Sequence, residues 1–454
     1  MATLVLLILI ITEIGFVTFE IISKVGKHEW ALRRVIVNAV EMVTYLLMVL
    51  LPGVDMGFRW RGLFVILILR LLVAGLLCIK KPKEDKKKNV AIMVLSAILS
   101  IVLISSSMVP AFLIKDYKGL PVSGPYKVIE SDIILVDASR VETFETDGSK
   151  REVPAHFFYP ENINELEEKS LPLIVFSHGA FGYYQSNMST YMELASNGYV
   201  VVSLDHPYHS FFTKDTDGKT ITVDPNFFQT AMNVGNSDVS ESEVYDITSK
   251  WMELREDDVN FVLDTIIEAS ETNELGDEWF LSDANEDMIC DIIKHIDITR
   301  IGVIGHSLGG ATAVNVGRRE DVLAVVDLDG TMIGEETGVK DGIIQVDETP
   351  YDTPLLSIDN DEHHFSRIEC EETGVVYANN IILDNATEGF ETYVEGSGHM
   401  NFTDLPLISP TLASLLGTGD VDSEECMMKI NSITLKFFDC YLKGSGDFAV
   451  DEKL

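Results

Sequence analysis

The sequence predicts an α/β fold, in which helices cover both faces of a mostly parallel β-sheet, preceded by a bundle of about four apolar helices. Two observations support this division. Residues 1–118 carry a net charge of +7, whereas residues 119–454 carry −45. The first part contains long apolar runs, and the second contains short apolar segments separated by stretches long enough for helices.

Four apolar runs in the first part have about the length that a helix needs to cross a bilayer. They are Ala2–Ile22, Ala31–Leu51, Leu63–Ile79 and Val90–Ile114. Charged residues interrupt them at Glu13, Glu20, Glu41 and Arg70. Each of these costs about 2.5–3.5 kcal/mol at mid-membrane on insertion scales, and so few charges do not indicate a transport pathway. The first run lacks the basic start of a signal peptide. We therefore expect residues 1–115 to form a transmembrane helical region.

Basic residues predict the orientation of these spans. Two loops are basic, the first through Lys24, Lys27, Arg33 and Arg34 and the second through Lys80–Lys88. Short loops rich in Lys and Arg stay in the cytoplasm. A four-span topology then places everything after Ile114 on the exterior side, and the expected location is the plasma membrane.

After the membrane region we expect a linker over residues 116–130 and a large exterior domain over residues 131–454. The acidity of this domain argues against nucleic-acid binding. Its four cysteines show no CxxC spacing, so no metal site is expected from them.

The exterior domain begins with two alternating runs around Asp147-Gly148, which predict a hairpin. The strand candidates that follow are Leu173–Ser177, Tyr199–Asp205, Ile301–Gly305, Val322–Leu328, Leu355–Asp359 and Thr392–Glu395. The wide interval at about 206–298 predicts a lid-like insertion over the carboxyl edge of the sheet. Within it, Asp215, Asp217 and Gly218 faintly resemble a calcium loop, but the other ligands are missing and a hairpin turn is favoured.

The segment Gly305-His306-Ser307-Leu308-Gly309 has the pattern G-x-S-x-G. It follows a short apolar strand candidate and precedes small residues suited to a closely packed helix. This context predicts a sharp strand-to-helix turn that presents Ser307 as a nucleophile. The flanking glycines are needed because such a turn leaves no room for a Cβ atom.

A serine hydroxyl needs a base within hydrogen-bond reach and an acid that orients the base. The usual chain order is nucleophile, acid and histidine, which leaves His363, His364 or His399 as the base. His399 follows a strand candidate in a glycine-rich loop, so we expect it to be the base. His363 and His364 lie in a charged run and are interpreted as a surface pair.

Two strand ends offer the acid. Asp327 and Asp329 end the strand after the Ser307 turn, and Asp359 and Asp361 end the next strand. The pattern alone leaves the choice between these ends open.

Acyl transfer also needs two N–H groups aimed at the developing oxyanion. The loop His178-Gly179-Ala180-Phe181-Gly182 follows a strand candidate, and its glycines allow close backbone approach. We expect the N–H of Ala180 to be one donor and the N–H of Leu308 the other, with His178 in a structural role. Nearby aromatic residues are either the lining of an apolar pocket or ordinary core: Phe181, Tyr183, Tyr184, Phe211 and Phe212.

Six segments in this order resemble one family. They are VPAHFFYP, LIVFSHGAFG, ELREDDVNFVLD, RIGVIGHSLGGATA, VVDLDG and GSGHMNF. Together they are similar to the plasma-type platelet-activating factor acetylhydrolases and their bacterial lipase-like relatives, within the α/β-hydrolases. The resemblance implies the α/β-hydrolase fold, with Ser307 as nucleophile, His399 as base and Asp329 as acid, and leaves Asp361 as runner-up. The apolar helices and the acidic region before the turn depart from the family pattern.

The expected function is that of a membrane-anchored serine ester hydrolase acting on short-acyl or lipid esters, with no metal or other cofactor. An acyltransferase or a peptidase would use the same three residues, and a non-catalytic binding protein of this fold should lack one of them. Because the base must be neutral to accept a proton, activity is expected to rise between roughly pH 6 and 8.

Overall fold

The computed structural model describes residues 1–79, 86–234, 239–280 and 286–454. The Lys-rich loop used to predict the membrane orientation therefore lies partly outside the described residues. The chain divides into two compact units. The helical unit comprises Met1–Lys118 with Leu407–Leu412, and the sheet unit comprises Gly119–Pro406 with Ala413–Leu454.

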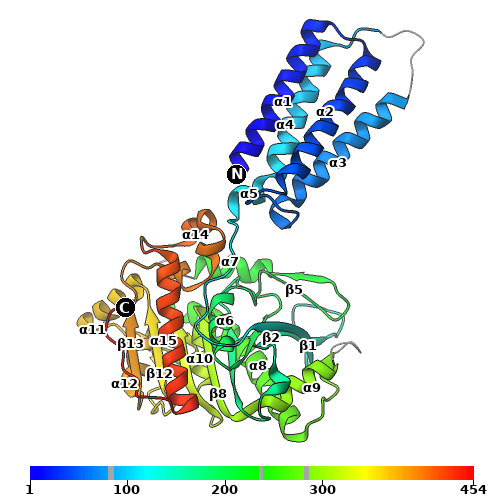
Figure 1. Ribbon diagram of the computed structural model, residues 1–454. Coiled ribbons are helices and arrows are strands. Elements are labelled where there is room, and N and C mark those ends of the chain that lie inside the picture. Colours follow the sequence, from blue (N-terminus) through cyan, green and yellow to red (C-terminus); the bar gives the residue numbers. More distant parts are fainter. Residues whose placement is uncertain (80–85, 235–238, 281–285) are drawn as a thin grey trace. The chain divides into compact units, whose positions relative to one another are not determined.

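Among its described residues up to Lys118, the helical unit contains four long helices and one short helix (Figure 1). They are α1 (Ala2–Ser23), α2 (Lys27–Met48), α3 (Phe58–Ile79), α4 (Val90–Ser107) and α5 (Val109–Leu113). Among the described residues, three of them, α1, α3 and α4, are long and apolar enough to cross a membrane. Helix α2 covers most of the second predicted run but also carries Glu29, Arg33 and Arg34. The count of four spans therefore stays a prediction.

Charged side chains of the apolar runs meet inside the helical unit. Glu13 of α1 contacts Arg34 of α2, at 2.7 Å between Oε2 and Nη1, and also contacts Arg70 of α3. Arg70 also lies 2.8 Å from Glu41. All four side chains are buried. Opposite charges on different helices thus pair with one another, which reduces the cost of placing them among apolar residues.

A nine-stranded sheet forms the centre of the sheet unit, in the order β13-β12-β9-β8-β3-β4-β2-β1-β7. Its strands are β1 (Val128–Val141), β2 (Lys150–Pro160), β3 (Leu171–Ser177), β4 (Val200–Leu204), β7 (Trp279–Phe280), β8 (Ile296–His306), β9 (Val322–Leu328), β12 (Leu355–Asp359) and β13 (Gly389–Tyr393). The six strands from β13 to β4 are parallel, and β2, β1 and β7 pair antiparallel. This is the mostly parallel sheet that the sequence predicts.

The predicted turns and strands agree closely with the structure. β1 and β2 pair around Asp147-Gly148, and Gly148 has the positive φ of 81° that such a turn favours. The turn over Asp215 to Gly218 joins β5 (Phe212–Lys214) to β6 (Thr220–Thr222), so the hairpin interpretation is confirmed. A second small sheet pairs β10 (Glu336–Lys340) with β11 (Ile343–Val346). The last strand, β13, begins and ends earlier than predicted.

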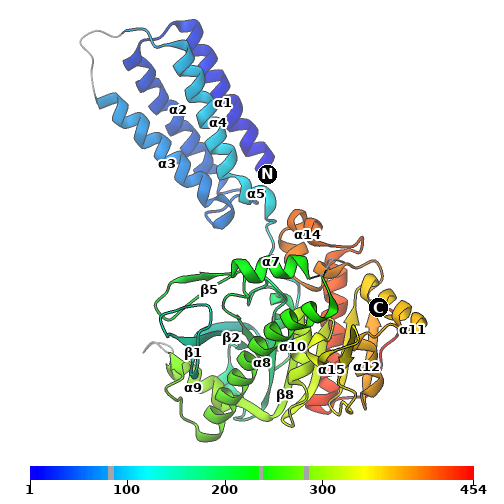
Figure 2. The same cartoon turned by 180° about the vertical axis from the view of Figure 1, so that it is seen from behind.

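Helices cover both faces of the large sheet (Figures 1 and 2). The described α-helices that follow β3 in the chain are α6 (Met188–Ser196), α7 (Pro225–Asn233), α8 (Glu241–Thr272), α9 (Glu286–His295), α10 (Leu308–Val316), α11 (Asp361–Thr373), α12 (Ala378–Asn385), α13 (Leu405–Ile408), α14 (Pro410–Leu416) and α15 (Ser423–Lys443). One buried cluster joins α8, α9, α10 and α12 to the sheet, and another joins α6 and α15 to its opposite face. Alternate strand residues serve the two clusters: Val175 belongs to the first and Phe176 to the second.

Helix α8 lies in the interval predicted as a lid-like insertion, but its buried face contributes Val259, Val262 and Ile266 to the core. Helix α7 lies in the same interval. A lid role for the interval at about 206–298 stays a prediction.

The sheet topology explains why distant segments meet. From β3 the chain runs outward to β4, whereas from β8 it runs in the other direction through β9 and β12 to β13. Residues beyond the carboxyl ends of parallel strands share one edge of the sheet, and ligands bind where the direction reverses. Here the reversal lies between β3 and β8, which end at Ser177 and His306.

Candidate active site

Ser307 occupies a strained turn between β8 and α10. Its φ of 56° and ψ of −123° lie outside the regions that L-residues normally adopt. Its N–H donates to Leu328 O at 2.9 Å, and its side chain does not cap α10. Ser307 is half-buried between fully buried neighbours. The turn therefore places Ser307 at the carboxyl edge of the sheet, between β8 and α10.

The two glycines of the motif are there because the backbone packs too closely for any side chain. A Cβ atom on Gly305 would lie 2.0 Å from Gly309 O, and one on Gly309 would lie 2.0 Å from Ser177 O. Both obstacles are backbone atoms, which cannot rotate away. The start of α10 is thus pressed against the end of β3, where the predicted oxyanion loop begins.

His399 and Asp329 are in direct contact. His399 Nδ1 lies 2.6 Å from Asp329 Oδ2, although 70 residues separate them in the chain. His399 begins the 3-10 turn η3 (His399–Phe402), after the glycine-rich loop that follows β13. Since a carboxylate accepts hydrogen bonds, Nδ1 is assigned the proton, which leaves Nε2 as the basic nitrogen.

The carboxylate of Asp329 is held from several sides. It follows β9 and is buried, and Asn360 donates to it twice, from its backbone N at 2.8 Å and from Nδ2 at 2.7 Å. Burial alone would raise the pKa of Asp329. Contacts with His363 and His399 outweigh burial and hold that pKa well below its usual range. Asp329 is therefore ionised and fixed in direction.

His306 links the His399 turn to the Ser307 turn. Its ring lies 4.7 Å from the His399 ring between centroids, and its Nε2 lies 3.3 Å from His399 O. Burial lowers the pKa of His306 to about 3, so the ring is neutral and Nε2–H is assigned as the donor. The residue just before Ser307 thus holds the backbone of the predicted base. The sequence alone indicates no role for His306, because His306 occupies a variable position of the G-x-S-x-G motif.

The other acid candidates do not contact His399. Asp361 accepts from Gly396 N at 2.9 Å, Asp359 pairs with Arg367 at 3.1 Å, and Asp327 accepts from Gly330 N at 2.9 Å. The geometry therefore favours Asp329 among the four.

The interpretation of His363 and His364 as a surface pair is wrong. His363 Nδ1 lies 2.9 Å from Asp329 Oδ1, and His364 is buried and stacked on Tyr393 with 3.9 Å between ring centroids. Both lie near the start of α11, and Asn360 caps that helix by accepting from His363 N. This cap positions His363 so that its side chain contacts Asp329. The charged sequence around His363 does not predict that contact.

The predicted oxyanion loop lies beside Ser307. A Cβ atom on Gly179 would lie 3.2 Å from Ser307 Cβ and 2.8 Å from His306 Nδ1, so only glycine fits. Within the described part of the chain, the N–H groups of Ala180 and Leu308 donate to no acceptor. Both expected donors are thus available to a ligand. His178 is buried and stays inside the loop, with Nδ1 2.7 Å from Gly179 O.

The aromatic residues divide between core and cavity. Phe181 packs against Phe227 and Phe228 near Leu308. Tyr184 and Phe212 line a cavity of about 550 Å³ together with Asp132, His156 and Asp205.

Two clusters of described residues contain potential metal ligands, Asp329 with His363 and His399, and Glu130 with Asp132 and His156. In the first cluster each histidine Nδ1 already faces the carboxylate.

A family model described as platelet-activating factor acetylhydrolase, isoform II, matches residues 160–453. The chain belongs to this family. The resemblance drawn from the six sequence segments is thereby confirmed.

Three relatives are named platelet-activating factor acetylhydrolase. The protein of Bos taurus is 23% identical over 61% of this chain and 58% of its own length. That of Cavia porcellus is 25% identical over 64% and 61%, and that of Gallus gallus is 23% identical over 61% and 63%. This chain therefore spans about three fifths of the length of these relatives.

A solved structure, ferulic acid esterase from Streptomyces cinnamoneus, is similar in fold. It has a TM-score of 0.51 and 21% identity, and the match covers 73% of this chain and 94% of the esterase. The sheet unit thus resembles the α/β-hydrolase fold of an esterase.

Proposed function

We propose that this member of the family is a membrane-anchored serine ester hydrolase, which acts on short-acyl or lipid esters at the exterior side of the plasma membrane. The observation that carries the proposal is the 2.6 Å contact between His399 and Asp329, next to the strained turn of Ser307. The names of the relatives and of the esterase of similar fold point to the same chemistry. The apolar helices α1, α3 and α4 support the anchor.

The proposed mechanism begins when His399 Nε2 accepts the proton of Ser307 as its Oγ attacks the carbonyl carbon of the ester. The carbonyl oxygen becomes an oxyanion, to which the N–H groups of Ala180 and Leu308 donate. His399 then returns the proton to the leaving alcohol, and the acyl group remains on Ser307. Asp329 stabilises the imidazolium in each step and keeps the ring in the correct orientation.

The second half repeats this chemistry with water. His399 takes a proton from a water molecule, the resulting hydroxide attacks the acyl-enzyme, and Ser307 leaves with the proton from His399. The products are the carboxylic acid and the free enzyme. No step needs a metal or an organic cofactor.

The experiment uses the full chain in detergent micelles, with acetyl, butyryl and octanoyl esters and a phospholipid that carries an acetyl group. We expect turnover of the short esters, loss of at least about 10³-fold in kcat for Ser307→Ala, and no change for the control Ser432→Ala, an exposed serine on α15. Product analysis identifies the acceptor of the acyl group. Transfer to an amine or alcohol in preference to water would indicate an acyltransferase, and cleavage of peptides alone would indicate a peptidase.

A further inference from the structure

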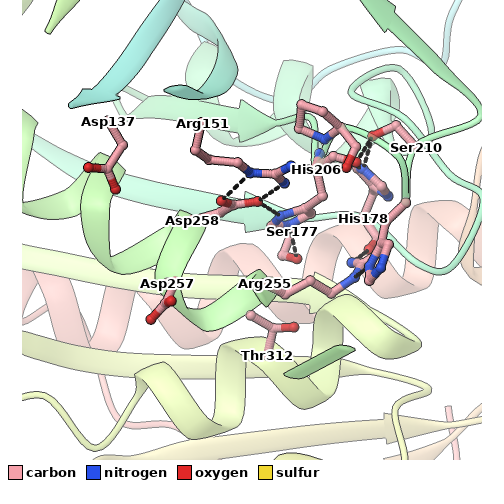
Figure 3. Close-up of polar contacts among 12 residues, drawn as sticks. Asp137, Arg151, Ser177, His178, His206, Ser210, Arg255, Asp257, Asp258 and Thr312 are labelled. Carbon is pink, nitrogen blue, oxygen red and sulfur yellow. Dashed lines mark hydrogen bonds and ion pairs between the residues drawn. The ribbon is translucent and has the colours of Figure 1, made fainter. Parts of the chain in front are cut away.

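A fully buried arginine lies behind the predicted oxyanion loop. Arg255 projects from α8 toward the end of β3, and its side chain is 0% exposed (Figure 3). Its Nη1 donates to His178 O at 2.5 Å, and its Nη2 donates to Gly179 O at 3.4 Å. Its Nε lies 3.4 Å from His209 Nδ1. The two terminal nitrogens of the guanidinium thus donate to two successive carbonyl groups of the loop.

This cation has no acidic partner at contact distance. Among the described residues, no carboxylate lies within ion-pair distance of the Arg255 guanidinium. Asp258, one turn further along α8, pairs instead with Arg151 at 2.6 Å and with His206 at 3.0 Å (Figure 3). Burial lowers the pKa of Arg255 to about 9, so the side chain is still charged at neutral pH. Burying a cation without a direct counter-ion is costly, and the carbonyl oxygens of the loop, together with the nearby charge of Asp258, offset part of that cost.

The carbonyl group of Gly179 is the most heavily bonded group of the loop. It accepts from His178 Nδ1 at 2.7 Å and from Gly182 N at 3.0 Å, in addition to Arg255. Burial, together with the charge of Arg255, holds the pKa of His178 well below its usual range. His178 is therefore neutral, and its Nδ1 carries the proton that it donates.

Fixing this carbonyl fixes the next N–H. The Gly179–Ala180 peptide is planar and trans, so the Ala180 N–H points away from the Gly179 C=O. All three donors hold the oxygen on one side of the peptide. The N–H must then point to the other side, and it has no acceptor among the described residues. Gly179 itself lies against Ser307, which places this free N–H close to the reacting group.

We propose that Arg255 is a positioning residue that, with His178, holds the Gly179–Ala180 peptide so that the Ala180 N–H faces the developing oxyanion. The proposal rests on the proposed ester hydrolase function. Without Arg255 the carbonyl groups of His178 and Gly179 each lose a donor, so the Gly179–Ala180 peptide is held less firmly and can rotate more easily. A rotated peptide would present an oxygen where the oxyanion needs a donor. Substrate binding does not need this donor, so the effect should fall on kcat and leave KM nearly unchanged.

The test compares Arg255→Met with Arg151→Met in the full chain in detergent. Arg151 is the matched control because it is also a buried arginine near Asp258. It bonds to Asp258, Glu142 and Pro207 O, all of which lie outside the oxyanion loop. Active sites are counted by titration with a fluorophosphonate, so kcat refers only to folded enzyme. The affinity for a trifluoromethyl ketone, which forms an oxyanion on Ser307, is measured in parallel.

We expect Arg255→Met to lose about 10- to 100-fold in kcat per titrated site, with KM within about threefold of wild type. The affinity for the trifluoromethyl ketone should fall by a similar factor. Arg151→Met should keep kcat per site within about threefold. Wild-type kcat per site in Arg255→Met, or equal losses in both variants, would overturn the positioning role.

Two further outcomes are informative. If Arg255→Met does not fold, Arg255→Lys replaces it, since an ammonium group keeps the charge but lacks the planar fork. This variant should lose at least about fivefold in kcat per site, and wild-type turnover would overturn the proposal. Absence of ester turnover in the wild type would instead overturn the proposed function, and the positioning role with it.

Discussion

His363 Nδ1 lies 2.9 Å from Asp329 Oδ1, on the carboxylate oxygen that His399 does not contact. Burial opposes the charge on His363, but its contact with Asp329 raises the pKa of His363 to about 9. The proposed catalytic acid is thus shared by two histidines, one of which, His363, is positively charged at neutral pH.

The first prediction concerns stability and pH. The folded-state pKa of His363 lies above the value of about 6.5 for an unfolded histidine, so its contribution is full below about pH 6.5 and is lost as the pH rises through about 9. We expect His363→Gln to lower the free energy of unfolding by on the order of 2 kcal/mol at pH 6, and by much less at pH 10. Urea unfolding of the full chain at both values checks this. An equal loss at both would contradict the ion pair.

The second prediction separates the acid candidates. Asp329→Asn removes the charge that stabilises the imidazolium and allows the wrong tautomer of His399, so kcat should fall by about 10³–10⁴-fold. Asp361→Asn, the matched control, should change kcat by less than about threefold, because Asp361 contacts Gly396 N rather than His399. Steady-state kinetics decides between them. A larger loss for Asp361→Asn would show that the acid assignment is wrong.

The third prediction tests the close packing around Ser307. Gly309→Ala places a Cβ atom 2.0 Å from Ser177 O, and the backbone on both sides would have to move. We expect loss of ester turnover together with a drop of more than about 3 kcal/mol in the free energy of unfolding of the sheet unit. Gly15→Ala in α1, where a Cβ atom meets nothing within 4 Å, should change neither property. Full activity of Gly309→Ala would contradict the described turn.

The fourth prediction concerns the helical unit. Glu13→Leu leaves Arg34 without its buried partner, so it should destabilise this unit by about 3 kcal/mol or more. Glu29→Leu removes a glutamate whose side chain is 51% exposed and should cost less than about 1 kcal/mol. Thermal unfolding in detergent, followed by circular dichroism, measures the difference. Equal behaviour of the two variants would argue against the buried network.

Much of the fold was predictable because the signals are local. The strands β9 and β12 have the predicted bounds, and the sharp turn at Ser307 follows from its glycines. The packing of α8 on the sheet was less predictable. Most of its surface is acidic, and only a narrow apolar face packs on the sheet. The overall composition of a helix does not distinguish its apolar face from its polar face, and the packing in the folded protein shows which face is buried.

The candidate site was predictable in its reacting groups and much less so in its supports. Ser307 and His399 lie in motifs, and the resemblance to the family pointed to Asp329. Asn360 bonds to Asp329, which lies 31 residues away in the chain, and Arg255 bonds to His178 O, which lies 77 residues away. The segment ELREDDVNFVLD, which contains Arg255, formed part of the family resemblance. The sequence of this segment does not indicate which carbonyl groups the Arg255 side chain will contact.

The most direct test of the proposed nucleophile is the site of covalent labelling. The full chain in detergent is treated with a fluorophosphonate, digested and analysed by mass spectrometry, with a heat-unfolded sample as control. We expect one adduct, on Ser307, that is absent after unfolding and strongly reduced in His399→Gln. An adduct on another serine, or no adduct on the folded wild type, would contradict it.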